Sequence, residues 1–121
     1  MGGDSDDIIT GSSGKNTLAG GRGDDTLTGN GGADTFILSG GHDLIQDFSG
    51  NDSIQVAKEV SYTDSSGAIV TEYQIDSLTD LSFNAGVLSV NFDGNDIPIA
   101  TLDGVSSLDI NNNVSLFDIP I

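Results

Sequence analysis

The sequence predicts an all-β protein in which a run of short repeats is followed by a β-rich cap. Segment 2–55 keeps a nine-residue period without an insertion. Segment 56–121 loses that period but contains stretches where apolar and polar residues alternate, as they do in half-buried strands. No helical period of apolar residues appears in this second segment. We expect the two segments, 2–55 and 56–121, to pack as one unit.

The repeats are six consecutive nonapeptides that begin at Gly2 and share three columns of residues. The fourth position holds Ser5, Gly14, Gly23, Gly32, Gly41 and Gly50. The sixth position holds Asp7, Asn16, Asp25, Asp34, Asp43 and Asp52. The eighth position holds Ile9, Leu18, Leu27, Phe36, Ile45 and Ile54. A low-complexity linker would have no reason to place a large apolar residue at every ninth position, so the period indicates an ordered fold.

Each nonapeptide reads as about six turn-forming residues followed by a three-residue strand. Side chains alternate between the two faces of a strand, so only the apolar eighth residue points inward. Glycine in the turn allows positive φ angles and lets carbonyl groups converge. The Asp column then places a carboxylate beside those carbonyls. Six to eight oxygen ligands around one point suit a hard cation such as Ca²⁺.

One repeat carries a specific family resemblance. Residues 20–28 read G-G-R-G-D-D-T-L-T, and this segment resembles the G-G-x-G-x-D-x-U-x nonapeptide of RTX, or hemolysin-type calcium-binding, proteins. The resemblance implies a right-handed parallel β-roll with two nonapeptides per turn, and so about three turns here. It also implies that about three to four Ca²⁺ ions bind between stacked turns.

The resemblance implies a set of metal ligands, because it stacks each repeat on the one two places further on. The implied pairs of side chains are Asp7 with Asp25, Asn16 with Asp34, Asp25 with Asp43, and Asp34 with Asp52. The other implied ligands belong to early turn positions, mainly through their carbonyls: Gly2, Asp4, Gly11, Ser13, Gly20, Gly21, Arg22, Gly23, Gly29, Asn30, Gly31, Gly32, Gly41 and Gly50. The uncharged Asn16 predicts a weaker site. The departures from the pattern are Ser5, Leu38, Asp47 and Phe48.

The metal is expected to be part of the fold. Stacked carboxylates repel one another, and one inward side chain per repeat forms a thin core against the entropy of ordering the chain. Ca²⁺ reverses the repulsion, so its binding energy becomes folding energy. We therefore expect the repeats to be largely unfolded without Ca²⁺ and to fold at roughly 10⁻⁴–10⁻³ M, the range of extracellular modules.

The second segment is expected to form strands at 68–75, 87–92, 97–102 and 114–117, with a turn at 93–96. Such a segment can cap the open end of the repeats, whose strand edges would otherwise be unpaired. The junction at 32–54 resembles the end of the roll in serralysin-type proteases and related secreted proteins. This resemblance implies a bacterial extracellular protein with an uncleaved type I secretion region. The implied partners are calcium, the secretion machinery and upstream domains.

The composition excludes other classes of partner. The 121 residues include 19 Asp or Glu and only 3 Lys or Arg, for a formal net charge of −16. Nucleic acids and anionic membrane surfaces attract basic proteins, so neither is an expected partner. No apolar run reaches the ~20 residues of a membrane span. The absence of cysteine excludes disulfides and thiolate metal sites.

One other function, carbohydrate binding, remains open at this point. The repeats also resemble the accessory carbohydrate-binding R-modules of mannuronan epimerases. Catalysis is not expected, since the chain has no nucleophile–base constellation. His42 is expected to be an exposed turn residue. Asp43 and Asp47 are interpreted as a ligand and a cap residue and not as the paired carboxylates of a glycosidase.

Overall fold

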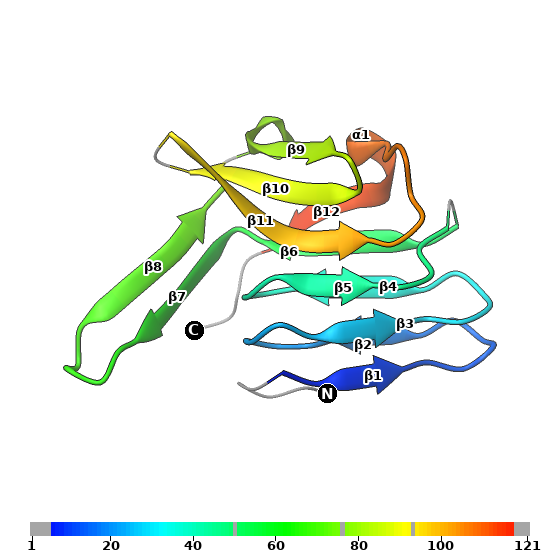
Figure 1. Ribbon diagram of the computed structural model, residues 1–121, viewed down its shortest axis with the longest axis horizontal. Coiled ribbons are helices and arrows are strands. Elements are labelled where there is room, and N and C mark those ends of the chain that lie inside the picture. The colour runs from blue at the N-terminus through cyan, green and yellow to red at the C-terminus, as the bar shows by residue number, and fades with distance from the viewer. Residues whose placement is uncertain (1–5, 50, 76, 93, 118–121) are drawn as a thin grey trace.

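The structure, a computed structural model, describes residues 6–49, 51–75, 77–92 and 94–117. Almost all of the regular structure in these residues is β (Figure 1). The repeats supply β1 (Ile8–Thr10), β2 (Thr17–Ala19), β3 (Thr26–Thr28), β4 (Thr35–Leu38), β5 (Asp43–Ile45) and β6 (Ser53–Ala57). Each of these short strands contains one apolar eighth-position residue, as the nine-residue period predicts.

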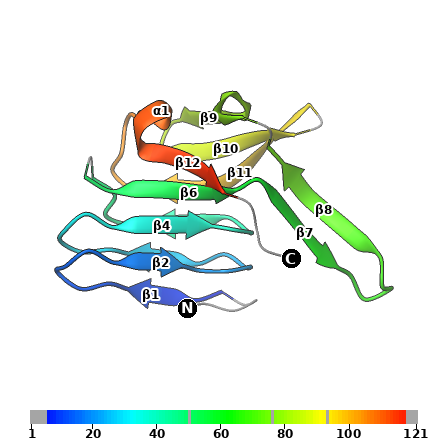
Figure 2. The same ribbon diagram turned by 180° about the vertical axis from the view of Figure 1, so that it is seen from behind.

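Successive repeat strands alternate between two parallel sheets. The order β1-β3-β5 lies in one sheet and β2-β4-β6 in the other, and Figure 2 shows the second sheet from behind. The register places residues 18 apart side by side, such as Ile9 beside Leu27 and Phe36 beside Ile54. This separation equals two nonapeptides, so every sixth-position residue lies over its counterpart two repeats away.

The eighth-position column forms the apolar interior of the repeats. Leu18 is 2% exposed, and Leu27, Phe36, Ile45 and Ile54 are fully buried. Ile9 is only half-buried, because it belongs to β1, whose partner lies on one side only among the described strands. The period in the sequence thus predicts the inward face of the repeats residue by residue.

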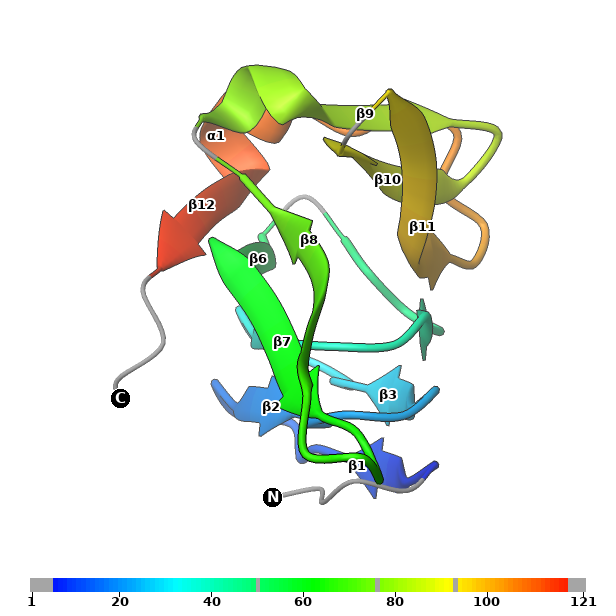
Figure 3. The ribbon, with the colours of Figure 1, turned by 90° about the vertical axis from the view of Figure 1, so that its left-hand side faces the viewer.

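The second segment contains more elements than its alternating pattern predicts. Its strands are β7 (Glu59–Thr63), β8 (Ile69–Gln74), β9 (Leu81–Asn84), β10 (Val87–Phe92), β11 (Asn95–Leu102) and β12 (Val114–Phe117). A 3₁₀ turn, η1 (Leu78–Asp80), precedes β9, and a single helical turn, α1 (Ile110–Asn113), precedes β12. The strands β7 and β8 form a hairpin of their own, which projects from the rest of the molecule in Figure 1 and lies nearest the viewer in Figure 3.

The second segment continues both sheets of the repeats. The last residues of β11 pair in parallel with β5, with Ala100 beside Asp43. The strand β12 pairs in parallel with β6, with Val114 beside Ile54. Antiparallel β10 and β9 then extend the first sheet, giving the orders β1-β3-β5-β11-β10-β9 and β12-β6-β4-β2. One apolar cluster runs through both segments, so the edges of β5 and β6 are covered as a cap would cover them.

The predicted all-β class and the parallel repeat strands are confirmed. The two sheets stay separate and do not close into one solenoid. The strands expected at 87–92 and 114–117 are observed, and the strand expected at 68–75 is β8. The strand expected at 97–102 begins earlier, at Asn95, so the turn before it is shorter than predicted. The division of the chain at residue 55 stays a prediction, and β6 runs across it.

Candidate metal centre

Hydrogen bonds join the sixth-position residues into two ladders, one for each sheet. The backbone N–H of each residue donates to the Oδ1 atom of the Asp two repeats further on. The four distances are 2.8 Å from Asp7 to Asp25, 2.9 Å from Asn16 to Asp34, 2.9 Å from Asp25 to Asp43 and 2.8 Å from Asp34 to Asp52. These are the four pairs that the resemblance implies, so the structure brings each pair together; their role as ligands stays a prediction.

The second carboxylate oxygen of three Asp residues is buried without a partner. Asp25, Asp34 and Asp43 are each 1% exposed. In all three the Oδ1 atom accepts the ladder hydrogen bond, while Oδ2 is buried and has no hydrogen-bond partner. A buried carboxylate that lacks a partner is strongly unfavourable. These three positions therefore require a proton or a cation.

The pKa values of two ladder residues also indicate that their charges must be compensated. Burial raises the pKa of Asp43 to about 8, and the nearby carboxylate of Asp25 adds to the shift. Burial also raises the pKa of Asp25, with further contributions from the charges of Asp7 and Asp6. Without a cation, both groups bind a proton more tightly than an ordinary carboxyl does. A divalent cation would compensate the same charge without requiring acid pH.

The turns are stacked closely enough that glycine is required at several positions. A Cβ atom on Gly20 or Gly29 would overlap the carboxylate of Asp25 or Asp34 in the same repeat. A Cβ on Gly32, which has φ +86°, would lie 2.7 Å from the carbonyl oxygen of Gly14. Gly41 is packed against the carbonyl of Gly23 in the same way. Carbonyl oxygens of one turn therefore face the next turn, beside the carboxylates.

This set of donors fits Ca²⁺. Carboxylate and carbonyl oxygens are the hard ligands that Ca²⁺ prefers. Among the described residues, no three His, Asp or Glu side chains gather closely enough to hold an ion by themselves. The carboxylates would therefore bind a cation only together with backbone carbonyls. That agrees with the sequence expectation, in which most of the implied ligands are turn residues.

Most of the predicted turn residues lie where the period places them. Ser13, Gly11, Gly21, Arg22, Gly23, Gly29, Asn30, Gly31, Gly32 and Gly41 all fall in the connections between repeat strands. Asn30 adopts the left-handed conformation, with φ 65°, which Asn tolerates better than most residues. Gly2, Asp4 and Gly50 lie outside the described residues.

Sequence reasoning missed two serines in the ladders. The side-chain oxygen of Asn16 accepts the backbone N–H of Ser12 at 2.6 Å. The Oδ2 atom of Asp52 accepts the backbone N–H of Ser49 at 2.9 Å and lies 3.3 Å from its hydroxyl. Serine three or four residues before an Asx residue is the available signal. It is not sufficient, because Ser39 precedes Asp43 by four residues and Asp43 Oδ2 has no partner.

Two interpretations of single residues need correction. His42 is half-buried and not an exposed turn residue, because its Nε2 lies 2.7 Å from the hydroxyl of Thr101 in β11. The carboxylate of Asp47 accepts the N–H groups of Gly29 and Asn30, at 2.9 and 2.6 Å. Asp47 therefore ties the sixth repeat to the fourth instead of belonging to the cap.

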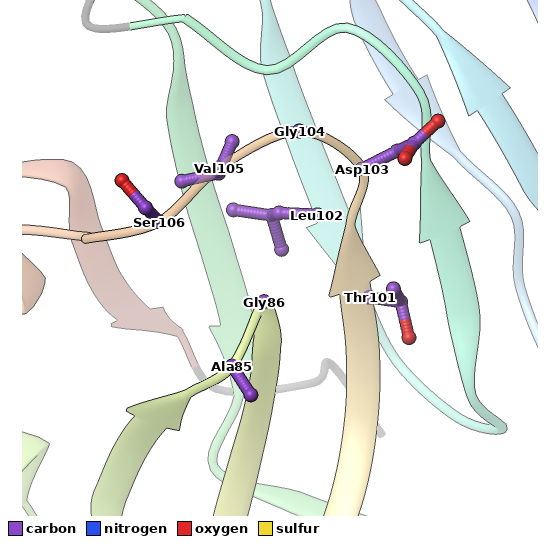
Figure 4. Close-up of a pocket in the computed structure, with 8 residues that line it drawn as sticks. All are labelled: Ala85, Gly86, Thr101, Leu102, Asp103, Gly104, Val105 and Ser106. Atoms are coloured by element: carbon purple, nitrogen blue, oxygen red, sulfur yellow. The ribbon is translucent and has the colours of Figure 1, made fainter.

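A separate hollow lies outside the ladders, between the turn Ala85–Gly86 and segment 101–106 (Figure 4). It is open to solvent, and Asp103 is the charged residue among those that line it. The carboxylate of Asp103 points away from the centre of this hollow in Figure 4. A single carboxylate provides no acid–base pair and no ligand set, so the hollow adds nothing to the candidate centre.

A comparison with models of known protein families identifies the repeats. A family model described as the RTX calcium-binding nonapeptide repeat matches four copies, over residues 1–36, 10–45 and 28–55. The matches thus cover slightly less than half of the chain. No curated protein matches the sequence. No helix among the residues that the structure describes is both long and apolar enough to cross a membrane.

Proposed function

We propose, from the premise that residues 1–55 are RTX calcium-binding nonapeptide repeats, that this chain is a calcium-dependent folding module. In this proposal the repeats form a three-turn β-roll once Ca²⁺ binds between their turns. The module folds outside a bacterial cell and is the C-terminal part of a protein exported by a type I secretion system. It acts by binding and folding and not by catalysis.

One observation supports the calcium dependence above the others. Three Asp side chains are fully buried with one oxygen each left without a hydrogen bond. The chain contains only 3 Lys and Arg against 19 Asp and Glu, so it has few cations of its own to neutralise them. Ca²⁺ supplies the missing charge when it is bound. The residues of this chain then position it: the Asp ladder orients the carboxylates, and the stacked glycines present the carbonyls.

The calcium dependence is tested by circular dichroism of the whole chain in EGTA and during titration with Ca²⁺. We expect a reduced β signal in EGTA, because the repeats are largely unfolded there, and a full β spectrum that develops at roughly 10⁻⁴–10⁻³ M free Ca²⁺. Mg²⁺ at the same concentrations is the control, and it should be much less effective because it demands a compact octahedral shell. A spectrum that is the same in EGTA and in Ca²⁺ would contradict the proposal.

The export role follows from the compartments that the module would cross. A chain whose repeats are unfolded at low Ca²⁺ can pass through an exporter more readily than a fully folded one, and its repeats can then fold where Ca²⁺ is abundant. The test fuses residues 1–121 to a passenger in a bacterium that has a type I exporter, with the passenger alone as the control. We expect the fusion in the medium. Retention of the fusion inside the cell would contradict the export role but not the calcium dependence.

The carbohydrate-binding alternative has less support. Flat sugar rings are commonly bound by exposed aromatic side chains, whereas the large exposed hydrophobic residues in the described part of the chain are the aliphatic Ile8 and Ile69. A glycan pull-down with and without Ca²⁺ separates the two functions.

A further inference from the structure

We propose that Ser12 and Ser49 take the place of the metal in two of the repeats. In this proposal Ca²⁺ binds around Asp25, Asp34 and Asp43, and the positions of Asn16 and Asp52 are completed by hydrogen bonds alone. The inference rests on the proposed calcium binding. It specifies which sixth-position residues of repeats two to six need an ion and which do not.

The contrast is sharpest between Asp34 and Asp52, which are neighbours in one ladder. Both are buried, with 1% and 3% exposure. The Oδ1 atom of each accepts a ladder N–H, from Asn16 and Asp34 respectively. The Oδ2 atom of Asp34 then has no partner, whereas that of Asp52 accepts the N–H and approaches the hydroxyl of Ser49. Hydrogen bonds to a charged oxygen are the stronger kind, so Asp52 is satisfied without a cation.

Asn16 is completed in a similar way at the other end of the repeats. Its side-chain oxygen accepts the N–H of Ser12 at 2.6 Å, and its Nδ2 donates to the Ser12 hydroxyl at 3.2 Å. The amide carries no charge, so nothing at this position demands a cation. Ser12 and Asn16 therefore form a closed pair of neutral groups.

A second, independent contact joins the sixth repeat to the fourth, and it involves no metal. The carboxylate of Asp47 accepts two backbone N–H groups of the fourth repeat, from Gly29 and Asn30. The consensus nonapeptide has glycine at the position of Asp47 and therefore has no such contact. Asp47 thus joins the sixth repeat to the fourth by hydrogen bonds that the consensus nonapeptide does not provide.

The first test counts the bound ions in Asp34→Asn and Asp52→Asn, a matched pair that removes one charge each from the same ladder. Native mass spectrometry of the whole chain in Ca²⁺ should find three ions in the wild type, two in Asp34→Asn and three in Asp52→Asn. Four or more ions in the wild type, or loss of an ion in Asp52→Asn, would overturn the inference. A wild-type chain that binds no calcium would instead overturn the proposed function itself.

A gain of binding provides a test that does not depend on a damaged variant. The double change Ser12→Gly with Asn16→Asp turns the second repeat into G-G-S-G-K-D and removes the Ser12 hydroxyl, which contacts the side chain of residue 16. We expect four ions in this variant. Ser39→Gly, at the equivalent position of the fifth repeat, is the control and should leave the count at three. A count of three in the double variant would refute the role of Ser12.

Discussion

The repeats and the second segment share one continuous core but differ in strand length, strand direction and buried charge. The repeat strands are three to five residues long, run in parallel and connect turns that stack acidic groups. In the described residues, the buried charged side chains are Asp25, Asp34, Asp43 and Asp52, all from the repeats. The second segment has longer antiparallel strands, of six residues in β10 and eight in β11, and it buries apolar groups such as Leu88 and Ile99.

This difference separates two sources of stability within one molecule. Apolar burial in the second segment is available to the chain alone, since it depends only on removing side chains from water. The interior of the repeats contains charge that must be neutralised before the fold is favourable. The calcium dependence of stability should therefore be greatest in the repeats. It should be smallest in β9 and β10, which lie farthest from the ladders in sheet order.

The largest expected effect is the loss of the repeats on chelation. In EGTA we expect the amides of β1 to β5 to lose most of their protection from hydrogen exchange, because the buried carboxylates lose their neutralising charge. The amides of β9 and β10 should retain more protection. Hydrogen-exchange mass spectrometry in Ca²⁺ and in EGTA measures both regions in one sample. Equal loss of protection in both regions would show that they do not differ in this way.

A rise in pH should change the melting temperature in opposite directions with and without calcium. The folded pKa of Asp43, about 8, lies above the ordinary value of 3.8, so protonation favours the calcium-free fold. That stabilisation is complete below about pH 4 and is lost as the pH rises towards 8. In EGTA the melting temperature should therefore fall over this range. In Ca²⁺ it should rise, because the ligands must be deprotonated.

Thermal melts followed by circular dichroism at several pH values check this prediction. The hairpin of β7 and β8 contains a carboxyl group whose pKa is lowered and not raised, and it provides an internal comparison. Hydrogen bonds from the Ser66 hydroxyl and from backbone N–H groups lower the pKa of Asp64, so its contribution is lost on acidification instead. A calcium-free melting temperature that stays constant or rises between pH 4 and 8 would contradict the assignment of buried acids to the repeats.

Two glycines with almost the same backbone angle provide a smaller comparison. Gly32 and Gly67 have φ +86° and +87°, but only Gly32 would place a Cβ against another turn. Gly67→Ala should cost about 1–2 kcal/mol, from the left-handed conformation alone. Gly32→Ala should cost about 1–3 kcal/mol more, because the turn beneath it must move. Urea unfolding in Ca²⁺ measures both, and equal losses would mean that the turns are not tightly stacked.

The smallest expected effect concerns the joint between the two regions. Thr101→Val keeps the shape of the side chain but removes the hydroxyl that contacts His42, across a distance of 2.7 Å. We expect a loss of about 0.5–1.5 kcal/mol. Thr28→Val, which removes a 2.7 Å contact with Gln46 inside the repeats, is the matched control. Both are read from urea unfolding in Ca²⁺, where an unchanged stability of Thr101→Val would argue against a link at this joint.

The sequence predicts the parts of this fold that the nine-residue period specifies. A large apolar residue every nine positions identifies the buried column from Leu18 to Ile54, and a separation of 18 identifies which carboxylates meet. The contacts that the period does not specify could not be predicted. The pairing of β11 with β5 joins residues 57 apart, such as Asp43 and Ala100. The contact of His42 with Thr101 depends on that pairing.

Other features that the sequence did not predict have a local cause. The strands β7 and β9 have only five and four residues, and their positions follow from their partners in β8 and β10 more than from their own pattern. The serines of the ladders were missed because the same residue behaves differently in different repeats. Ser12 contacts Asn16, while Ser39 stands at the equivalent position before an Asp43 whose Oδ2 has no partner.

The way in which the second segment meets the repeats leaves their number unrestricted. Among the repeat strands, β11 and β12 pair only with β5 and β6, which are the last two. Earlier nonapeptides could therefore be added or removed without changing that junction. Each added pair would lengthen the body by the spacing of one strand, about 4.8 Å. The length of the body is thus set by how often the nonapeptide is repeated.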